Sequence, residues 1–209
     1  MKEYKKQIII TSVITILPML AGILLWGRMP DKVAVHWGMD NVANGWAGKA
    51  MAVFGMPVLL LAVQLICIFV TLNDPKKQNV GPKLLKLIFW FIPIISWVCC
   101  GTIYMTAVGI KVNVGLWANL LIGIFFAALG NYMPKGKQSY TVGMKLPWTL
   151  NSAENWNRTS RFTGKLWIAG GICFLLNAFL QIGKLIFPLL ILLVLIPAIY
   201  SYTLYKKGI

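Results

Sequence analysis

Residues 130–164, GNYMPKGKQSYTVGMKLPWTLNSAENWNRTSRFTG, form the longest hydrophilic interruption in a very apolar chain. The stretch contains several lysines and arginines, two tryptophans and two tyrosines, but a single acid, Glu154. On both sides of it the sequence consists of apolar runs long enough to cross a membrane as helices, for which about 20 residues suffice. We therefore interpret the stretch as a polar segment that joins two groups of membrane spans.

The composition of the chain favours an integral membrane protein. Of the 209 residues 58% are hydrophobic and 12% are charged, whereas about 25% are charged in a typical soluble domain. A chain this apolar cannot cover a water-facing surface. The net charge of +15 comes from short basic clusters between apolar runs, which is typical of the cytoplasmic flanks of membrane spans. Direct nucleic-acid binding, which uses a basic soluble face, is not expected.

Six apolar runs predict an all-α membrane protein with six transmembrane helices in three antiparallel pairs. The runs cover approximately residues 7–27, 50–72, 87–110, 112–133, 166–182 and 185–205. The first run is too long for the core of a typical signal peptide and is interpreted as a retained span. Pro18 and Gly22 are expected to bend it, since membrane helices tolerate both residues. Residues 183–184 leave only a very short turn between the last two runs.

Lysine and arginine are distributed unequally over the two ends of these spans. Fifteen lie on the side of the two termini and five lie on the other side. Because basic residues accumulate in cytoplasmic loops, both termini and the amphipathic segment 134–165 are predicted to be cytoplasmic. Residues 28–49 then form a small extracellular loop element.

The middle of every predicted span lacks Asp, Glu, Lys, Arg and His. Ion-coupled transporters and intramembrane proteases usually need an ionisable residue at depth, so both classes are disfavoured. The amides within the spans are interpreted as interhelical hydrogen bonds of about 1 kcal/mol each; they are Gln64, Asn119, Asn177 and Gln181. Gly123 and Ala127 form a small-xxx-small pair, which predicts a closely packed helix face.

The cysteines predict neither disulfides nor a metal site. All four lie within apolar runs and none has metal-ligand spacing; they are Cys67, Cys99, Cys100 and Cys173. They are interpreted as reduced, small core residues. No cofactor is expected from this set of residues.

The outer loop, residues 28–49, predicts a small β-hairpin. Val33, Val35 and Trp37 alternate with smaller or polar residues as in a strand, and Gly38 and Asn44-Gly45 indicate turns. His36 is the only histidine; a hydrogen bond or a ligand contact is favoured over a metal site, because zinc needs three or four ligands. The candidate outer recognition residues are His36, Trp37, Asp40, Asn44 and Trp46. The alternative for the tryptophans is anchoring in the lipid headgroups.

The central segment predicts a short amphipathic helix. Ser152 is a candidate N-cap for a helix over residues 153–161, in which Glu154 and Arg158 are spaced for an ion pair. The favoured interpretation places the aromatic residues Trp148, Trp156 and Phe162 in the headgroup layer and the basic residues on anionic lipid. A protein partner remains open. The candidate partner- or lipid-binding residues are Tyr140, Lys145, Trp148, Glu154, Trp156, Arg158 and Arg161.

Two sets of motifs carry a resemblance to a known family. The C-terminal set is Gly130-Asn131-Tyr132-Met133, Tyr140, Gly143, Pro147-Trp148-Thr149-Leu150, Glu154, Trp156, Thr159, Arg161 and Gly164. The N-terminal set is Pro30, Val35-His36-Trp37, Gly45-Trp46, Lys49 and Pro57. By the first set the chain resembles the SdpI family of bacteriocin (killing-peptide) immunity membrane proteins, and by the second it resembles a domain that often precedes the SdpI region. Lys145-Leu146 and Ser160 depart from the family pattern, where Arg-Thr and His are expected.

The resemblance implies a two-span N-terminal region, residues 1–80, and an SdpI-like four-span region, residues 81–209. It implies a protein of the bacterial cell membrane that protects a producing cell from an exported killing peptide, with membrane lipids and that peptide as partners. It further implies a signalling role, in which the protein holds a cytoplasmic ArsR-type repressor at the membrane. The resemblance implies neither an enzyme nor a cofactor.

Two alternatives to this function remain. In a membrane-surface enzyme, Tyr140, Glu154, Arg158 and Arg161 would surround a lipid headgroup, but the segment has one carboxylate and no Cys or His to complete a catalytic set. A transporter is disfavoured by the absence of charges at depth.

Overall fold

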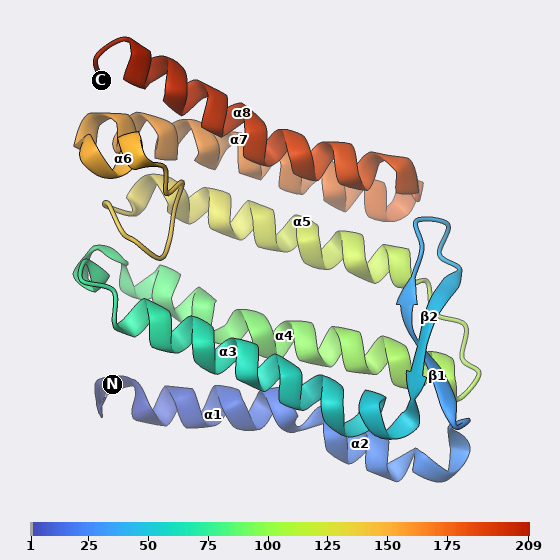
Figure 1. Cartoon of the computed structure of the whole chain (residues 1–209). Coiled ribbons are helices and arrows are strands. Elements are labelled where there is room, and N and C mark those ends of the chain that lie inside the picture. The colour runs from blue at the N-terminus through green and yellow to red at the C-terminus, as the bar shows by residue number, and fades with distance from the viewer. Residues whose placement is uncertain (1) are drawn as a thin grey trace. The chain divides into compact units, whose positions relative to one another are not determined.

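The computed structural model describes residues 2–209 and contains six helical spans long and apolar enough to cross a membrane (Figure 1). The spans are Lys5–Leu24, Met51–Leu72, Pro82–Ala107, Val114–Lys135, Ala153–Leu180 and Gly183–Lys206. These segments confirm the predicted all-α membrane fold. The third begins five residues earlier than expected, because Pro82 is well tolerated in the first turn of a helix.

The longer helices are α1 (Lys5–Ile16), α2 (Pro18–Leu24), α3 (Met56–Leu72), α4 (Pro82–Ala107), α5 (Val114–Tyr132), α7 (Ala153–Leu180) and α8 (Ile186–Lys206). The short elements are α6 (Pro147–Asn151), the π-helical turn η3 (Met51–Gly55), and the 3-10 turns η1 (Lys2–Tyr4), η2 (Trp26–Arg28), η4 (Lys77–Asn79), η5 (Met133–Lys135) and η6 (Gly183–Leu185). The strands are β1 (Lys32–Trp37) and β2 (Ala43–Gly48).

The chain forms two compact units. Unit 1 consists of Met1–Phe69 and Lys86–Trp117, and unit 2 consists of Val70–Leu85 and Ala118–Ile209. Three helices, α3, α4 and α5, therefore begin in one unit and end in the other.

The first span of unit 1 bends where the sequence predicts it. Helix α1 ends at Ile16 and α2 begins at Pro18, because proline has no N–H to continue the helical hydrogen bonds. Gly22 allows α2 to pack closely against η3, since a Cβ atom at this position would lie 2.7 Å from a γ-methyl group of Val53. The bend and the glycine together bring α2 against the start of the second span.

A polar cluster in unit 1 connects α1, α3 and α4. Gln64 donates a hydrogen bond to Thr11 (2.9 Å) and accepts one from Thr15, while Ser96 donates to the backbone carbonyl of Thr15 (2.7 Å). All four side chains are buried. The predicted interhelical role of the Gln64 amide is confirmed.

The predicted hairpin of unit 1 is present, with β1 and β2 antiparallel. The predicted turn at Asn44-Gly45 is wrong, since both residues lie within β2. The chain turns instead between Gly38, whose N–H donates to the carbonyl of Val42 (2.8 Å), and β2. Asn41 adopts a left-handed conformation in this turn (φ 61°), which asparagine tolerates better than most residues.

The hairpin is attached to the helices of unit 1 through one face. Val33 belongs to a buried cluster with Val53, Cys100 and Tyr104. The Tyr104 hydroxyl lies 3.5 Å from the backbone carbonyls of Ala52 and Val53 in η3, where the π-helical turn alters the regular helical hydrogen bonds. Burial of these side chains fixes the hairpin on the ends of α2, η3 and α4.

In unit 2, α7 is one continuous helix of 28 residues. The expectation of a separate interfacial helix over residues 153–161, followed by a span from residue 166, is therefore wrong. Only Gly164 lies between the two predicted segments as a weak helix breaker, and a single glycine costs a helix about 1 kcal/mol. The close approach of another helix at this glycine compensates for that cost.

Helices α5 and α7 pack at backbone contact in unit 2. A Cβ atom at Gly130 would lie 2.7 Å from the carbonyl oxygen of Gly164, and a Cβ at Gly171 would lie 2.7 Å from that of Gly123. A Cβ at Gly171 would also lie 2.7 Å from the backbone nitrogen of Ala127. The predicted close-packing face at Gly123 and Ala127 is thereby confirmed.

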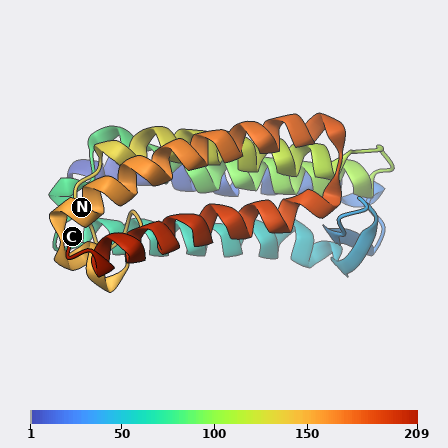
Figure 2. The same cartoon turned by 90° about the horizontal axis from the view of Figure 1, so that it is seen from above.

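Polar and aromatic side chains complete the packing of α7. Asn177 donates to the side chain of Asn119 on α5 (2.9 Å), which confirms the interhelical role predicted for both amides. Helix α8 lies beside α7, and the tight turn predicted at residues 183–184 joins them (Figure 2). The rings of Phe162 and Tyr200 stack between these two helices, with 4.4 Å between centroids.

We predict that Gly130→Val destabilises the protein by about 1–3 kcal/mol, because the added methyl groups would overlap backbone atoms of α7 that cannot move independently. The measurement is the midpoint of thermal unfolding of the purified protein in detergent. Gly101→Val on α4 is the matched control, since the only neighbour of its Cβ within 4 Å is the mobile end of Met105, at 3.8 Å. Equal midpoints for the two variants would contradict the α5–α7 contact.

Candidate functional site

Residues 133–152, between α5 and α7, are called the inner segment after the membrane side predicted for them. This segment is organised around the carboxylate of Asp74. Asp74 lies just after α3 and is only 3% exposed. Its Oδ2 atom accepts hydrogen bonds from four donors, which are the Ser139 hydroxyl (2.7 Å), the Tyr140 N–H (2.9 Å), the Thr141 N–H (3.0 Å) and the Thr141 hydroxyl (2.8 Å). One acid thereby fixes the conformation of three consecutive residues that are far from it in sequence.

The surroundings of Asp74 favour its ionised form. Burial by itself would raise the pKa of the carboxyl group, but hydrogen bonds from Ser139, the Lys76 N–H and Thr141 outweigh it, so the pKa lies below the ordinary value. The carboxylate is therefore ionised at neutral pH. Its contribution to docking of residues 138–142 is complete above the ordinary value of 3.8 and is lost as the pH falls through the lowered value.

Trp156 holds the same segment from the α7 side. Its indole N–H donates to the carbonyl of Gly136 (3.1 Å), and its ring lies against Gly143, where a Cβ atom would be 2.5 Å from the ring. Gly143 also has a φ of 123°, which side chains other than glycine rarely adopt. Trp156 is only 2% exposed, so its predicted place in the headgroup layer is wrong: the segment folds back over the ring and covers it.

Thr149 fixes the short helix α6. Its buried hydroxyl donates to the carbonyl of Met144 (2.7 Å) and accepts from the Leu146 N–H (2.9 Å). The side chain of Gln138 donates to the carbonyl of Thr149 (2.9 Å). These bonds connect the part of the segment bonded to Asp74 with the part that leads into α7.

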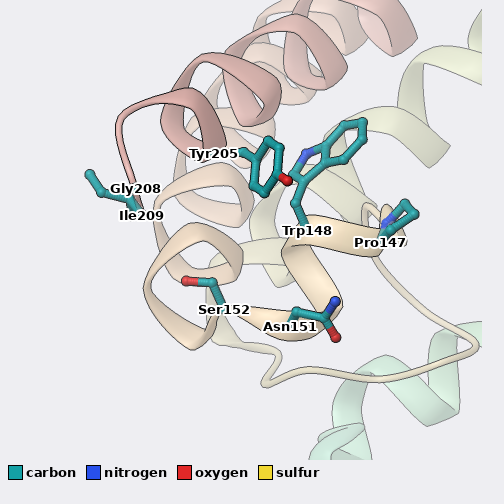
Figure 3. Close-up of a pocket in the computed structure, with 7 residues that line it drawn as sticks. All are labelled: Pro147, Trp148, Asn151, Ser152, Tyr205, Gly208 and Ile209. Atoms are coloured by element: carbon teal, nitrogen blue, oxygen red, sulfur yellow. The ribbon is translucent and has the colours of Figure 1, made fainter.

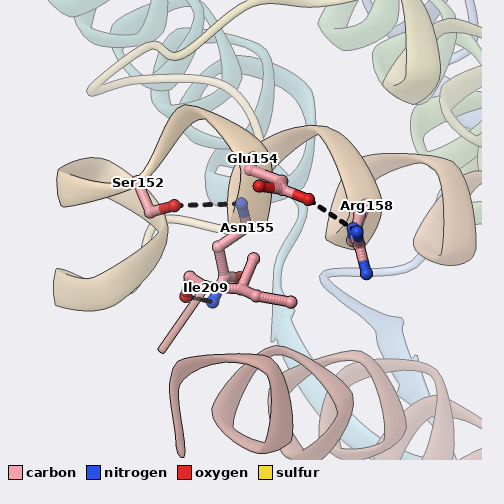
Figure 4. A network of polar contacts seen from close by, with 5 residues as sticks. All are labelled: Ser152, Glu154, Asn155, Arg158 and Ile209. Carbon is pink, nitrogen blue, oxygen red and sulfur yellow. Dashed lines mark hydrogen bonds and ion pairs between the residues drawn. The ribbon is translucent and has the colours of Figure 1, made fainter. Parts of the chain in front are cut away.

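A buried polar network ties the start of α7 to the end of α8. The Trp148 indole donates to the Ser201 hydroxyl (2.7 Å), which in turn donates to the Asn155 side chain (2.9 Å). The Asn155 amide donates to the carbonyls of Ser201 and Ile209 (both 3.1 Å). Figure 4 shows Asn155 beside Ile209, with Ser152 capping the helix as predicted by accepting from the Asn155 N–H (3.2 Å).

A cavity of about 490 Å³ opens at this end of unit 2. It is lined by Pro147, Trp148, Asn151, Ser152, Tyr205, Gly208 and Ile209. Figure 3 shows the rings of Trp148 and Tyr205 facing each other on one wall, with 5.8 Å between their centroids. The cavity thus has an aromatic wall beside amide and hydroxyl groups, and its volume falls in the range usual for ligand pockets.

The other candidate residues of this region, from the segment and from the start of α7, lie mostly on the surface. Exposed side chains are those of Tyr140, Lys145, Glu154, Arg158 and Arg161, while Trp148 is half-buried. The predicted pair of Arg158 and Glu154 is present at 2.6 Å, although an exposed pair contributes little to stability. Lys145 donates to the carbonyl of Thr141 (3.1 Å). The structure therefore gathers the charged candidates on the surface and separates them from the buried Trp156.

The hairpin of β1 and β2, called the outer hairpin after the membrane side predicted for it, has an exposed polar and aromatic face. His36 and Asn44 are exposed and share a hydrogen bond of 2.5 Å, which is the local bond that the sequence favours for His36. Trp46 on the same hairpin is 60% exposed, and Asp40 in the turn is also exposed. Trp37 differs from these candidates, because it is half-buried and packs against the core cluster of unit 1.

The turn of the hairpin contacts the start of α5. The Asn41 side chain accepts a hydrogen bond from the Gly115 N–H (2.9 Å), one of the amide groups that have no partner within a helix. The left-handed conformation of Asn41 thus supports a contact as well as a turn. Through this bond the hairpin is joined to the helix whose other end leads into residues 133–152.

Sequence reasoning missed the buried polar residues that hold the inner segment. They are Asp74, Ser139, Thr149, Asn155 and Ser201. The available signal for Asp74 was that it is one of only five acids in a chain with twenty basic residues. The remaining residues are ordinary polar side chains, and the partners through which they connect distant parts of the chain are 11 to 65 positions away.

The inner segment and the outer hairpin each lie largely or wholly within a part of the chain that matches a family model. Residues 135–201 match the SdpI/YfhL protein family, and residues 13–61 match a domain of unknown function, DUF1648. The C-terminal part of the chain is therefore similar to the SdpI/YfhL protein family. The SdpI/YfhL match begins in the inner segment and ends at Ser201, so it includes both partners of the Trp148–Ser201 bond. The DUF1648 match includes the whole outer hairpin.

A curated relative extends the likeness over the whole chain. The chain is 28% identical over 206 residues, 97% of each protein, to the immunity protein SdpI of Bacillus subtilis (strain 168). No solved structure matches the chain. The likeness to SdpI and the six apolar helices together describe a multi-pass bacterial membrane protein.

We predict that Asp74→Asn loosens the inner segment, because the amide is uncharged and its NH2 group must face either the donors around Oδ2 or the Lys76 N–H bonded to Oδ1. The charge-assisted hydrogen bonds that are lost are worth about 1.5–3 kcal/mol each. The measurement is limited trypsin digestion of the full chain at pH 7, followed by mass spectrometry. Faster cleavage after Lys137 and Lys145 is the expected result. In the unaltered protein, the accessibility of this segment to a covalent side-chain label should stay constant from pH 8 to 5. It should increase only below about pH 4, as Asp74 is protonated.

Asp40→Asn provides the matched control, since it removes an exposed carboxylate that accepts a single backbone hydrogen bond (Val42, 3.1 Å). Its digestion pattern should equal that of the unaltered chain. If Asp74→Asn and Asp40→Asn gave the same pattern, the carboxylate of Asp74 would not be what holds the segment.

Proposed function

We propose that the chain is a membrane immunity protein that protects its cell from an exported killing peptide. The observation that carries the proposal is the likeness to the Bacillus subtilis immunity protein SdpI over 97% of both chains. The likeness covers both the outer hairpin and the inner segment. A shared whole architecture supports a shared role better than one short motif does.

In this proposal both termini and residues 133–152 face the cytoplasm, and the hairpin faces outward. The support is the distribution of basic residues, fifteen on the side of the termini against five on the other. The even number of spans requires the two termini to lie on one side. The hairpin follows the first span and the inner segment follows the fourth, so the two lie on opposite sides.

The proposed contact surface for the killing peptide is the exposed hairpin face. His36 and Asn44 are preorganised by their hydrogen bond, and Trp46 offers a large exposed ring beside them. Exposed Trp combined with polar neighbours is typical of recognition surfaces. Asp40 contributes a negative charge in the turn.

The proposed inner role is to hold a soluble partner, such as an ArsR-type repressor, at the membrane. Its support is the exposed charged surface of Lys145, Arg158 and Arg161 and the nearby peptide-sized cavity at Trp148. The partner would contact the protein rather than nucleic acid. Because α5 joins the hairpin contact at Gly115 to the inner segment, one helix connects the two proposed surfaces.

The proposed role is not enzymatic. Ser152 serves as a helix cap, Ser160 is buried, and Glu154 is paired with Arg158. None of these groups is arranged as a nucleophile with an activating base. Binding is therefore the activity to test.

We predict that expression of the chain protects peptide-sensitive cells and that Trp46→Ala lowers this protection at least about tenfold, as expected for loss of a central aromatic contact of about 2 kcal/mol. The measurement is the peptide concentration that halves growth, at matched membrane expression. Leu24→Ala is the control, since Leu24 is exposed but lies outside the hairpin. Unchanged killing of cells that express the unaltered chain would remove the immunity proposal.

For the inner surface, we predict that an ArsR-type repressor encoded beside the gene sediments with membranes only when the peptide is present. Arg158→Gln with Arg161→Gln should release it, because the repressor would lose two exposed cationic contacts. Lys111→Gln with Lys184→Gln removes the same charge on the opposite side and should have no effect. A repressor that stays soluble throughout would remove the signalling proposal and leave immunity standing.

A further inference from the structure

A second cavity, of about 250 Å³, lies in unit 2 at the ends of two membrane spans. One wall is the start of α4, with Pro82 and Leu84, and the other is the end of α5, with the ring of Tyr132. The side chains of Lys83 and Lys135 also line it. The cavity is therefore largely apolar and lies beside two lysines at the ends of two membrane spans.

We propose that this cavity binds one anionic phospholipid, with the phosphate between Lys83 and Lys135 and the glycerol and upper acyl chain against Pro82, Leu84 and Tyr132. The proposal is independent of the immunity function, and it does not depend on which side of the membrane this end faces.

The charges around the cavity support an anionic ligand. Unit 2 contains twelve basic residues and two acids. Both acids are engaged elsewhere, Asp74 by residues 139–141 and Glu154 by Arg158. Within the part of the chain that the structure describes, neither cavity lysine takes part in an ion pair, so their positive charge is left for a ligand.

The geometry of Lys135 supports binding at a fixed place. Its ammonium lies 5.2 Å from the centroid of the Tyr132 ring and 3.2 Å from the side-chain oxygen of Asn131. These two contacts hold the charge next to the cavity without neutralising it. A positioned ammonium loses less side-chain entropy when it binds a phosphate than a free one does.

The size and lining favour a lipid over a soluble phosphate compound. Pockets for whole small molecules usually have about 300–1,000 Å³, and this cavity is smaller and largely apolar. It suits the part of an amphiphile that lies below the headgroup, while the remainder of the lipid stays in the bilayer. Lysines near span ends commonly attract anionic headgroups, and here a defined apolar cavity lies between two of them.

The test is native mass spectrometry of the full chain in detergent, titrated with phosphatidylglycerol or with phosphatidylcholine of the same acyl chains. We expect the first phosphatidylglycerol to bind at least about tenfold more tightly than the first phosphatidylcholine, given two lysines near one phosphate. Lys83→Gln with Lys135→Gln should abolish this preference. Lys83→Arg with Lys135→Arg should keep it, because guanidinium also binds phosphate.

The matched control is Lys77→Gln with Lys137→Gln. These lysines are exposed and lie six and two positions from Lys83 and Lys135 in the sequence, but they do not line the cavity. Their replacement removes the same charge. The control should retain the preference for the first phosphatidylglycerol. If both Gln pairs lost the phosphatidylglycerol preference equally, the preference would come from the overall positive charge of this region and the proposal would be wrong. Equal binding of both lipids by the unaltered chain would also overturn it. If inorganic phosphate at millimolar concentration displaced the lipid, the cavity would be a phosphate site and the lipid assignment would be wrong.

Discussion

The buried carboxylate of Asp74 is the interaction on which the arrangement of the inner segment depends. Residues 133–152 contain only the 3-10 turn η5 and the short helix α6, and therefore need external partners for their backbone groups. Asp74 supplies an acceptor for two consecutive backbone N–H groups and two hydroxyls. A neutral side chain could not accept four such bonds at one oxygen so favourably, because charge-assisted hydrogen bonds are about twice as strong as neutral ones. The rest of the segment is held by the hydrogen bonds of Thr149 within it and of Trp156 from α7.

A different constraint governs the helices, where lipid offers no hydrophobic driving force for their association. In unit 2 the chain uses glycine contacts between α5 and α7, and in unit 1 it uses buried hydroxyl and amide groups around Gln64. The surfaces at the span ends also differ between the two units. Unit 1 presents a rigid hairpin whose turn bonds to the start of α5, and unit 2 presents a charged segment with two cavities. Both proposed contact surfaces therefore lie at the ends of spans.

The sequence predicted the features that depend on local pattern. Apolar runs of sufficient length gave the six spans, Pro18 gave the bend, and alternation around Val35 gave the hairpin. The errors arose where tertiary contact overrides local preference. Gly164 looked like a boundary, but its contact with Gly130 keeps α7 continuous. Trp156 looked like a headgroup anchor, but the chain folds over it. The partners of Asp74 and Asn155 could not have been predicted, because a single sequence carries no signal that pairs residues tens of positions apart.

The central claim is that the hairpin and the inner segment face opposite sides of the membrane. Single cysteines at Asn44→Cys and Lys137→Cys, in a chain whose four native cysteines are replaced by alanine or serine, test it most directly. Both positions are exposed. A membrane-impermeant maleimide applied to intact cells should label Asn44→Cys at once and Lys137→Cys only after permeabilisation. Labelling of Lys137→Cys in intact cells, or of both positions equally, would contradict the account.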